Sequence, residues 1–212
     1  MKIKLCGFTT KESVANAVAQ KCDFLGFVFY EKSLRYITPE NAAAISANIP
    51  ANIARVGVVV DPTFELLQEI SEKFSPDFFQ FHGAETSEFL QKVSKNFPQT
   101  KIIKAFRVST KQDLAQVKSF ETVADFFLFD TKVAGEFGGS GKVFDWKILQ
   151  NFHSKKDWFL SGGLNSANIE EALQITAAKM VDISSGIEKI RGKKSPELIV
   201  ELMKKIKNCH AA

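Results

Sequence analysis

Polar and glycine residues follow several short apolar segments of this chain, and their types could do two kinds of chemistry. Thiol, imidazole and carboxyl side chains can exchange protons with a substrate. Glycine-rich turns can present backbone N–H groups to an anion. The residues stand in Cys6-Gly7, Gln80-Phe81-His82-Gly83, Asp130-Thr131-Lys132, Ser161-Gly162-Gly163 and Ser184-Ser185-Gly186, and Arg35 follows the second segment.

Each of these residues also has an ordinary structural explanation when it is taken alone. A lone cysteine is commonly an inert buried side chain, and we interpret Cys22 and Cys209 in that way. An aspartate after a strand often caps a turn, which leaves Asp130 open. His82 has no second histidine nearby, so we interpret it as a hydrogen-bonding structural residue rather than a base or a metal ligand.

Eight short apolar segments, rich in residues that favour strands, recur along the chain. The segments are predominantly apolar rather than regularly alternating between apolar and polar residues, which is typical of parallel strands buried on both faces. The segments are Ile3–Leu5, Phe24–Phe29, Ala54–Val60, Phe78–Phe81, Ile102–Phe106, Phe126–Phe129, Trp158–Leu160 and Met180–Ile183.

Helical patterns with start signals lie between most of these strands. The signals are Thr9 with Glu12, Thr38 before Pro39, Asp61 before Pro62, Ser109 with Gln112, and Ser195 before Pro196. In the last helix, Leu198, Leu202, Met203 and Ile206 recur at the spacing of one helical face. Strand and helix therefore alternate along the chain.

The alternation predicts an α/β fold, a (β/α)₈ TIM barrel that forms a single compact domain over residues 1–212. An open doubly wound sheet is the alternative, but the chain has no GxGxxG turn after the first strand and no Walker-type lysine loop. In such barrels the site lies at the carboxyl ends of the strands, where the polar residues above are found. The successive loops with Gly162, Gly163, Ser185 and Gly186 favour a phosphate site.

The composition fits a globular protein that binds a small anion. Among 212 residues, 28 basic and 24 acidic side chains give a net charge of +4, and no basic block predicts binding to nucleic acid. The uncharged run from Asn41 to Ala54 contains Pro50 and is too short to cross a membrane. Three cysteines form neither a CxxC pair nor an even set, which favours a reducing, cytoplasmic location and no zinc site.

The polar segments together resemble those of the phosphoribosylanthranilate isomerase family, over nearly the whole chain. The likeness lies in Lys4–Thr9, Gly26–Phe29, Ser33–Tyr36, Arg55–Val58, Gln80–Glu85, Asp130–Lys132, Gly138–Gly141, Phe144–Trp146, Ser161–Leu164 with Asn168, and Val181–Glu188. Two positions depart from the family pattern: Ser195 follows Gly192–Lys194 where aspartate is usual, and Phe81 stands where an aliphatic residue is commoner.

The resemblance implies an Amadori rearrangement in tryptophan biosynthesis. N-(5′-phosphoribosyl)anthranilate would become 1-(2-carboxyphenylamino)-1-deoxyribulose 5-phosphate, through one acid and one base. We expect no redox cofactor and no metal. The expected partner is this small phosphorylated anionic substrate, with no nucleic acid and no membrane, and the chain is expected to act as a monomer or homodimer.

The resemblance also implies roles for particular residues. Cys6 matches the family's base and Asp130 its acid. Arg35 would pair with the anthranilate carboxylate, and Gly162, Gly163, Ser185 and Gly186 would hold the phosphate. The stretch Gly138–Gly141 would form a lid over the sugar.

Two alternatives stay open. One is another phosphate-binding barrel enzyme, such as an indole-glycerol-phosphate synthase or a phosphoribosyl-formimino isomerase. Those relatives are expected to carry a catalytic lysine and glutamate set, or an aspartate at the end of the first strand, where this chain has Cys6. The other alternative is a barrel retained as a non-catalytic binding module, against which the presence of both Cys6 and Asp130 argues.

Overall fold

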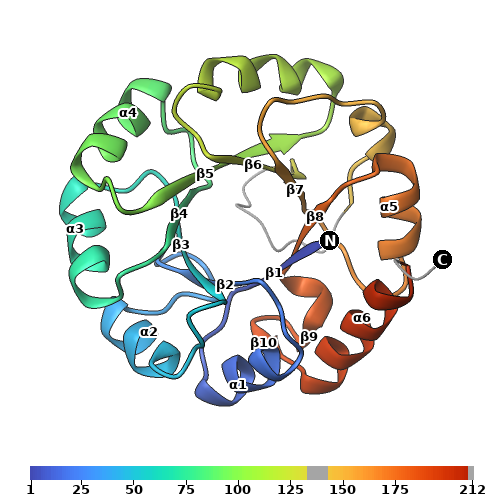
Figure 1. Ribbon diagram of the computed structural model, residues 1–212, viewed down its shortest axis with the longest axis horizontal. Coiled ribbons are helices and arrows are strands. Elements are labelled where there is room, and N and C mark those ends of the chain that lie inside the picture. Colours follow the sequence, from blue (N-terminus) through green and yellow to red (C-terminus); the bar gives the residue numbers. More distant parts are fainter. Residues whose placement is uncertain (133–142, 210–212) are drawn as a thin grey trace.

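The computed structural model describes residues 1–132 and 143–209, and in these ranges eight parallel strands close into a barrel. Each strand pairs with the next one along the chain, and the last pairs with the first (Figure 1). The predicted (β/α)₈ barrel and all eight predicted strands are confirmed. The strands are β1 (Lys2–Cys6), β2 (Phe24–Val28), β3 (Ala54–Val59), β4 (Phe78–Phe81), β5 (Lys101–Val108), β6 (Phe126–Thr131), β7 (Trp158–Leu160) and β8 (Met180–Ile183).

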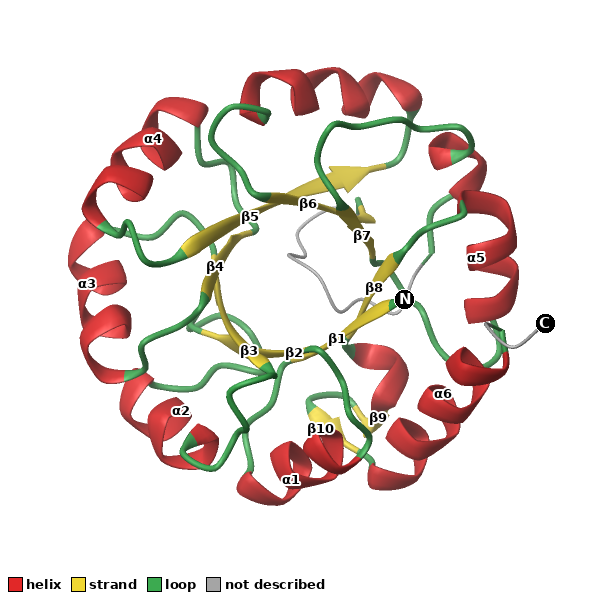
Figure 2. Cartoon of the chain, in the orientation of Figure 1, coloured by secondary structure: helices red, strands yellow, loops and turns green. Residues whose placement is uncertain are grey.

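Helices form a ring around the barrel (Figure 2). A small hairpin that the sequence did not predict, β9 (Glu188–Ile190) with β10 (Lys193–Lys194), follows β8. Within the described ranges, no helix has the length and apolar character needed to cross a membrane. The helices are α1 (Lys11–Ala19), α2 (Pro39–Ser46), α3 (Phe64–Lys73), α4 (Ser87–Asn96), α5 (Ile169–Thr176) and α6 (Pro196–Asn208), and the 3₁₀ segments are η1 (Lys111–Phe120), η2 (Trp146–Leu149) and η3 (Ser185–Ile187).

Two of the five predicted helix starts are confirmed. The hydroxyl of Thr38 accepts a hydrogen bond from Asn41 N at the start of α2, and Ser195 accepts one from Leu198 N at the start of α6. Ser195, which departs from the family pattern, therefore caps the last helix. The buried face of α6 is Ile199, Leu202, Met203 and Ile206, so the prediction was wrong at Leu198, which is half-buried.

The other three predicted starts were wrong by one or two residues. Thr10 caps α1 in place of Thr9, and Thr110 precedes η1 in place of Ser109. Helix α3 is capped by Thr63, since the carboxylate of Asp61 instead accepts a hydrogen bond from Ala84 N, at 2.7 Å. Because Asp61 binds the backbone of a neighbouring loop, its side chain does not cap the helix that follows it.

Alternate residues of each strand point into the barrel, and their types differ between its two ends. Toward the amino ends, Phe24, Phe78, Phe126 and Phe159 pack with ring centroids 5.3–6.0 Å apart. Phe81 has the opposite orientation and contacts Phe89 of α4, at 6.2 Å. This aromatic layer fills the barrel interior toward the amino ends of the strands. The polar side chains lie at the carboxyl ends.

Candidate active site

A pocket at the carboxyl end of the barrel collects polar side chains from most of the strands. Three residues predicted for the site, Cys6, Arg35 and Asp130, line it together. The remaining lining residues are Val28, Tyr30, Ser33, Val58, Val60, Gln80, His82, Ser161, Asp182 and Ser184. Residues that are far apart in the chain therefore meet in one cavity, as the barrel topology requires.

The four predicted phosphate residues lie beside this pocket, not in its lining. Gly162 and Gly163 follow β7 with φ of +91° and +67°, a conformation that glycine adopts without strain. Gly186 packs so tightly that a Cβ there would lie 1.9 Å from the carbonyl oxygen of Leu164. The two loops are therefore in contact, and Gly186 excludes any larger residue. The predicted lid, Gly138–Gly141, lies outside the described residues.

Asp130 is a buried carboxylate held at the end of β6. Its Oδ1 accepts a hydrogen bond from Thr131 N, at 2.7 Å, and its Oδ2 lies 3.2 Å from His82 Nε2. That second contact lacks the alignment of a hydrogen bond. The amide of Gln80 lies within hydrogen-bond distance of His82 Nδ1, at 3.1 Å. His82 thus lies beside Asp130, the predicted acid. The sequence did not predict this contact.

Cys6 is the last residue of β1, and its thiol is buried. Gly26, its partner on β2, makes room for it, because a Cβ at Gly26 would lie 2.6 Å from the sulfur. Burial raises the pKa of the Cys6 thiol above its ordinary value, and Asp182 adds to the rise. The ammonium groups of Lys4 and Lys194 act in the opposite direction, since a nearby cation favours the thiolate.

Below Cys6, a fully buried ion pair crosses from β1 to β8. Lys4 Nζ lies 2.8 Å from Asp182 Oδ1, and the side chains are 0% and 6% exposed. Ser161 donates a long hydrogen bond, of 3.4 Å, to the other oxygen of Asp182. Asp182 and Cys6 both attract the ammonium group of Lys4, and together they outweigh the effect of burial. The pKa of Lys4 is therefore raised, so this lysine stays charged at neutral pH.

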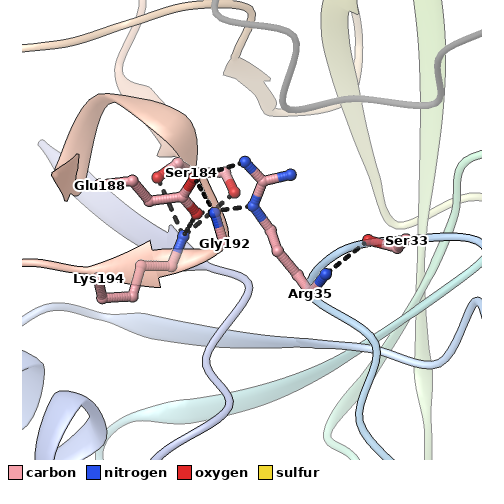
Figure 3. Close-up of polar contacts among 6 residues, drawn as sticks. All are labelled: Ser33, Arg35, Ser184, Glu188, Gly192 and Lys194. Atoms are coloured by element: carbon pink, nitrogen blue, oxygen red, sulfur yellow. Dashed lines mark hydrogen bonds and ion pairs between the residues drawn. The ribbon is translucent and has the colours of Figure 1, made fainter. Parts of the chain in front are cut away.

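A second buried network fixes Arg35 at the mouth of the pocket (Figure 3). Arg35 Nε and Nη2 each donate to a carboxylate oxygen of Glu188, at 2.7 Å, in a bidentate pair. Lys194 Nζ donates to Glu188 Oε1, at 2.7 Å, and to Ser184 O, at 3.0 Å. Figure 3 shows both cations turned toward the one carboxylate of Glu188. The hairpin β9–β10 therefore holds the loop between β2 and α2, which carries Arg35.

The charges of this network shift one another's protonation. Although burial acts against it, hydrogen bonds from Arg35 and Lys194 lower the pKa of Glu188 to about 2. Burial lowers the pKa of Lys194 to about 8, in spite of its attraction to Glu188. Gly7 leaves space for both cations, since a Cβ there would lie 2.5 Å from Arg35 Cδ and 3.3 Å from Lys194 Nζ.

A larger hollow, of about 820 Å³, lies at the opposite end of the barrel, between α5 and α6. Its charged lining residues Lys2, Asp157, Glu170 and Lys179 are exposed and Lys205 is half-buried, so none of its charged groups is buried. The pocket with Cys6 and Asp130 is therefore the candidate active site. In residues 1–132 and 143–209, no group of three His, Cys, Asp or Glu side chains is arranged to hold a metal ion.

Comparisons with known proteins point to one family. The family model for N-(5′-phosphoribosyl)anthranilate (PRA) isomerase matches residues 3–205. The chain is 40% identical over 208 residues to N-(5′-phosphoribosyl)anthranilate isomerase of Zymomonas mobilis, a match that covers 98% of each protein.

Two solved structures extend the likeness to the fold. The phosphoribosyl anthranilate isomerase of Thermotoga maritima superposes with a TM-score of 0.89 at 34% identity, over 98% of this chain and 99% of that one. A phosphoribosyl anthranilate isomerase in complex with reduced 1-(o-carboxyphenylamino)-1-deoxyribulose 5-phosphate superposes with a TM-score of 0.83 at 32% identity, over the same shares. The compound in that second structure is phosphorylated.

Proposed function

Since this chain belongs to the N-(5′-phosphoribosyl)anthranilate isomerase family, we propose that Cys6 and Asp130 carry out the proton transfers of its reaction. The chain is an isomerase of tryptophan biosynthesis, which converts N-(5′-phosphoribosyl)anthranilate to 1-(2-carboxyphenylamino)-1-deoxyribulose 5-phosphate. The observation that carries the proposal is the meeting of a buried thiol and a buried carboxyl, from β1 and β6, in one pocket.

Asp130 is the proposed acid in the first step. As the furanose opens, the bond between C1 and the ring oxygen breaks, and the oxygen takes a proton while the nitrogen forms a Schiff base with C1. A carboxylic acid within reach of that oxygen supplies the proton. The hydrogen bond from Thr131 N holds one carboxyl oxygen in place, and His82 faces the other. This arrangement keeps Asp130 in a single orientation toward the cavity.

Cys6 is the proposed base in the second step. Its thiolate takes the proton from C2, which gives an enolamine, and this intermediate becomes the ketone when C1 gains a proton and the C2 hydroxyl loses one. C1 is reduced and C2 is oxidised within one molecule, so the reaction consumes no external oxidant. The buried cations beside Cys6 favour the thiolate that this step needs.

Arg35 is the proposed partner of the anthranilate carboxylate. Its Arg35→Met variant should bind a carboxylated product analogue at least about tenfold more weakly, because hydrogen bonds to charged groups are worth about 1.5–3 kcal/mol. The kcat should change less than the affinity. Isothermal titration with the analogue measures the loss, and Arg55→Met, at the amino end of the barrel, is the matched control. An unchanged affinity in Arg35→Met would contradict this role.

The loops after β7 and β8 are proposed to hold the substrate phosphate. Inorganic phosphate should then inhibit competitively and raise the melting temperature, because a ligand that binds only the folded state stabilises it. A bulky residue at Gly163, in Gly163→Val, should remove both effects, and Ser185→Ala should weaken them. The quantity to compare is the shift that phosphate produces, not the melting temperature itself. Normal phosphate inhibition of Gly163→Val would mean that the anion binds elsewhere.

Growth without tryptophan tests the proposed function in a cell. A bacterial strain that lacks this isomerase activity should grow without added tryptophan when it expresses the parent chain. Expression of the Cys6→Ala variant at the same level should not restore growth. Failure of the parent chain to support growth, with the folded protein present in the cell, would contradict the proposal.

A further inference from the structure

A fully buried lysine lies inside the barrel two residues before the proposed base. Residues i and i+2 of a strand share a face, so Lys4 and Cys6 both point into the barrel from β1. The side chain of Lys4 is 0% exposed. A cation is rarely buried so completely unless it is paired, and the mechanism above counts Lys4 only as one of the cations beside Cys6.

The pairing of Lys4 with Asp182 is a weak explanation for its presence. A buried ion pair loses most of its attraction to the cost of removing two charges from water. An apolar pair of similar volume, in a barrel interior whose neighbouring side chains are mostly apolar, would stabilise the fold about as well. The ion pair does keep Lys4 charged, since Asp182 raises its pKa. The contact thus maintains a permanent cation beneath Cys6.

We propose that Lys4 is a positioning residue for the reaction, whose ammonium stabilises the negative charge that Cys6 carries when it acts as the base. This inference rests on the proposed function. Among the cations near Cys6, Lys4 has the largest effect on the pKa of the thiol, through its charge. Lys194 is the second cation, and like Lys4 it is paired with a buried carboxylate, that of Glu188 at 2.7 Å.

The charge of Lys4 matters because the proposed reaction needs a proton on Asp130 and none on Cys6, which is the unfavourable way to distribute one proton between a carboxyl and a thiol. Ring opening requires a proton on Asp130, and enolisation requires that Cys6 has none. A carboxyl ordinarily ionises at a much lower pH than a thiol. The productive form is therefore the minor one of two forms with the same number of protons. Any group that lowers the pKa of Cys6 increases the share of the productive form.

This protonation scheme couples two measurable quantities. The share of the productive form is independent of pH until Cys6 of the resting form loses its proton. The plot of kcat/KM against pH should therefore have a constant value near neutrality, which we call its level, and should decrease at alkaline pH, which we call the alkaline fall. A rise of one unit in the pKa of Cys6 reduces the level of kcat/KM tenfold and moves the alkaline fall up by one unit. A merely structural defect lowers the level without moving the fall.

Other charged and titratable groups also surround Cys6, so the variant must change only one of them. Asp182 opposes Lys4, because its carboxylate raises the pKa of the thiol. The remaining groups at the pocket and on the hairpin beside it are Tyr30, Arg35, His82, Asp130, Glu188 and Lys194. Replacement of Lys4 by methionine removes one charge, keeps an unbranched side chain of similar length and leaves these groups in place.

The test is the pH profile of kcat/KM for Lys4→Met against the parent protein. We expect the level to fall at least about tenfold and the alkaline fall to move up by at least about one unit. The ultraviolet absorbance of the thiolate, as a difference from Cys6→Ala, should report the same shift without any turnover. A lower level with an unmoved alkaline fall, or an unmoved thiolate titration, would overturn the proposal.

Lys104→Met is the matched control. Lys104 is also a strand lysine in a buried ion pair, 2.6 Å from Glu85, but it faces the ring of Phe120 in η1, outside the barrel interior. The control should lose stability without any shift of the thiolate titration. If Lys4→Met does not fold, Lys4→Met/Asp182→Asn removes both charges and leaves none unpaired. That variant should still shift the titration upward, by less than the single change, and no shift would overturn the proposal.

Failure of this inference and failure of the proposed function give different results. If the parent shows no turnover, or if Cys6→Ala keeps it, the proposed function is wrong. If the parent turns over through Cys6 and the titration of Lys4→Met matches that of the parent, only the role of Lys4 is wrong.

Discussion

Replacement of Cys6 by alanine should reduce turnover to the uncatalysed background while the protein stays folded. The change removes the only atom proposed to take the C2 proton, and no other buried thiol lines the pocket. The cost in stability should be small, since Cys6→Ala deletes a single heavy atom at a position beside Gly26. Initial rates and thermal melting, measured on the same preparation, separate the two effects.

Binding and two other cysteines provide the controls for that prediction. Cys6→Ala should bind the reduced product analogue within a few-fold of the parent, because the thiol acts on a proton rather than as an anchor. Cys22→Ala and Cys209→Ala should keep activity, since neither residue lines the pocket, and burial raises the pKa of Cys22 to about 12. A kcat of Cys6→Ala close to that of the parent would refute the assignment.

Asp130→Asn should lower kcat at least about a hundredfold and change substrate affinity far less. General acid catalysis is typically worth about 10² to 10⁴-fold, and an amide of the same shape has no proton to give at neutral pH. The side-chain oxygen can still accept the hydrogen bond from Thr131 N. Rates at saturating substrate measure the effect on chemistry, and analogue titration measures the effect on binding.

Asp77→Asn is the matched control for this carboxylate. Asp77 also accepts a backbone hydrogen bond, from Arg55 N at 2.7 Å, but it lies at the amino end of the barrel and is exposed. Its amide variant should keep a parental kcat. A kcat of Asp130→Asn within a few-fold of the parent would direct the search for the acid to other residues of the pocket, first to His82.

The barrel could be predicted because each buried strand is recognisable from the apolar residues of its own segment. Each strand is predominantly apolar, and that pattern does not depend on distant parts of the chain. Helix starts were predicted less well, because several residues that can cap a helix stand side by side. Thr9 and Thr10 are equivalent in sequence, and only the contact of Thr10 with Ser13 N distinguishes them.

The buried charge networks of the site could not be predicted, because their partners are distant in the chain. Lys4 and Asp182 are separated by 178 residues, and Arg35 and Glu188 by 153. Sequence alone cannot pair such charges. One signal was nevertheless available: Lys4 and Asp182 each interrupt an apolar strand, and Lys4 shares the inward face of Cys6. A charge at such a position is costly unless it is paired, which predicts a partner but not its identity.

The most direct test of the account is turnover of N-(5′-phosphoribosyl)anthranilate by the purified protein at neutral pH, beside the double variant Cys6→Ala/Asp130→Asn. The account predicts that the parent consumes the substrate and forms 1-(2-carboxyphenylamino)-1-deoxyribulose 5-phosphate. The folded double variant should bind the product analogue and convert no substrate above background. No consumption by the parent, or conversion by the double variant at a rate near that of the parent, would contradict it.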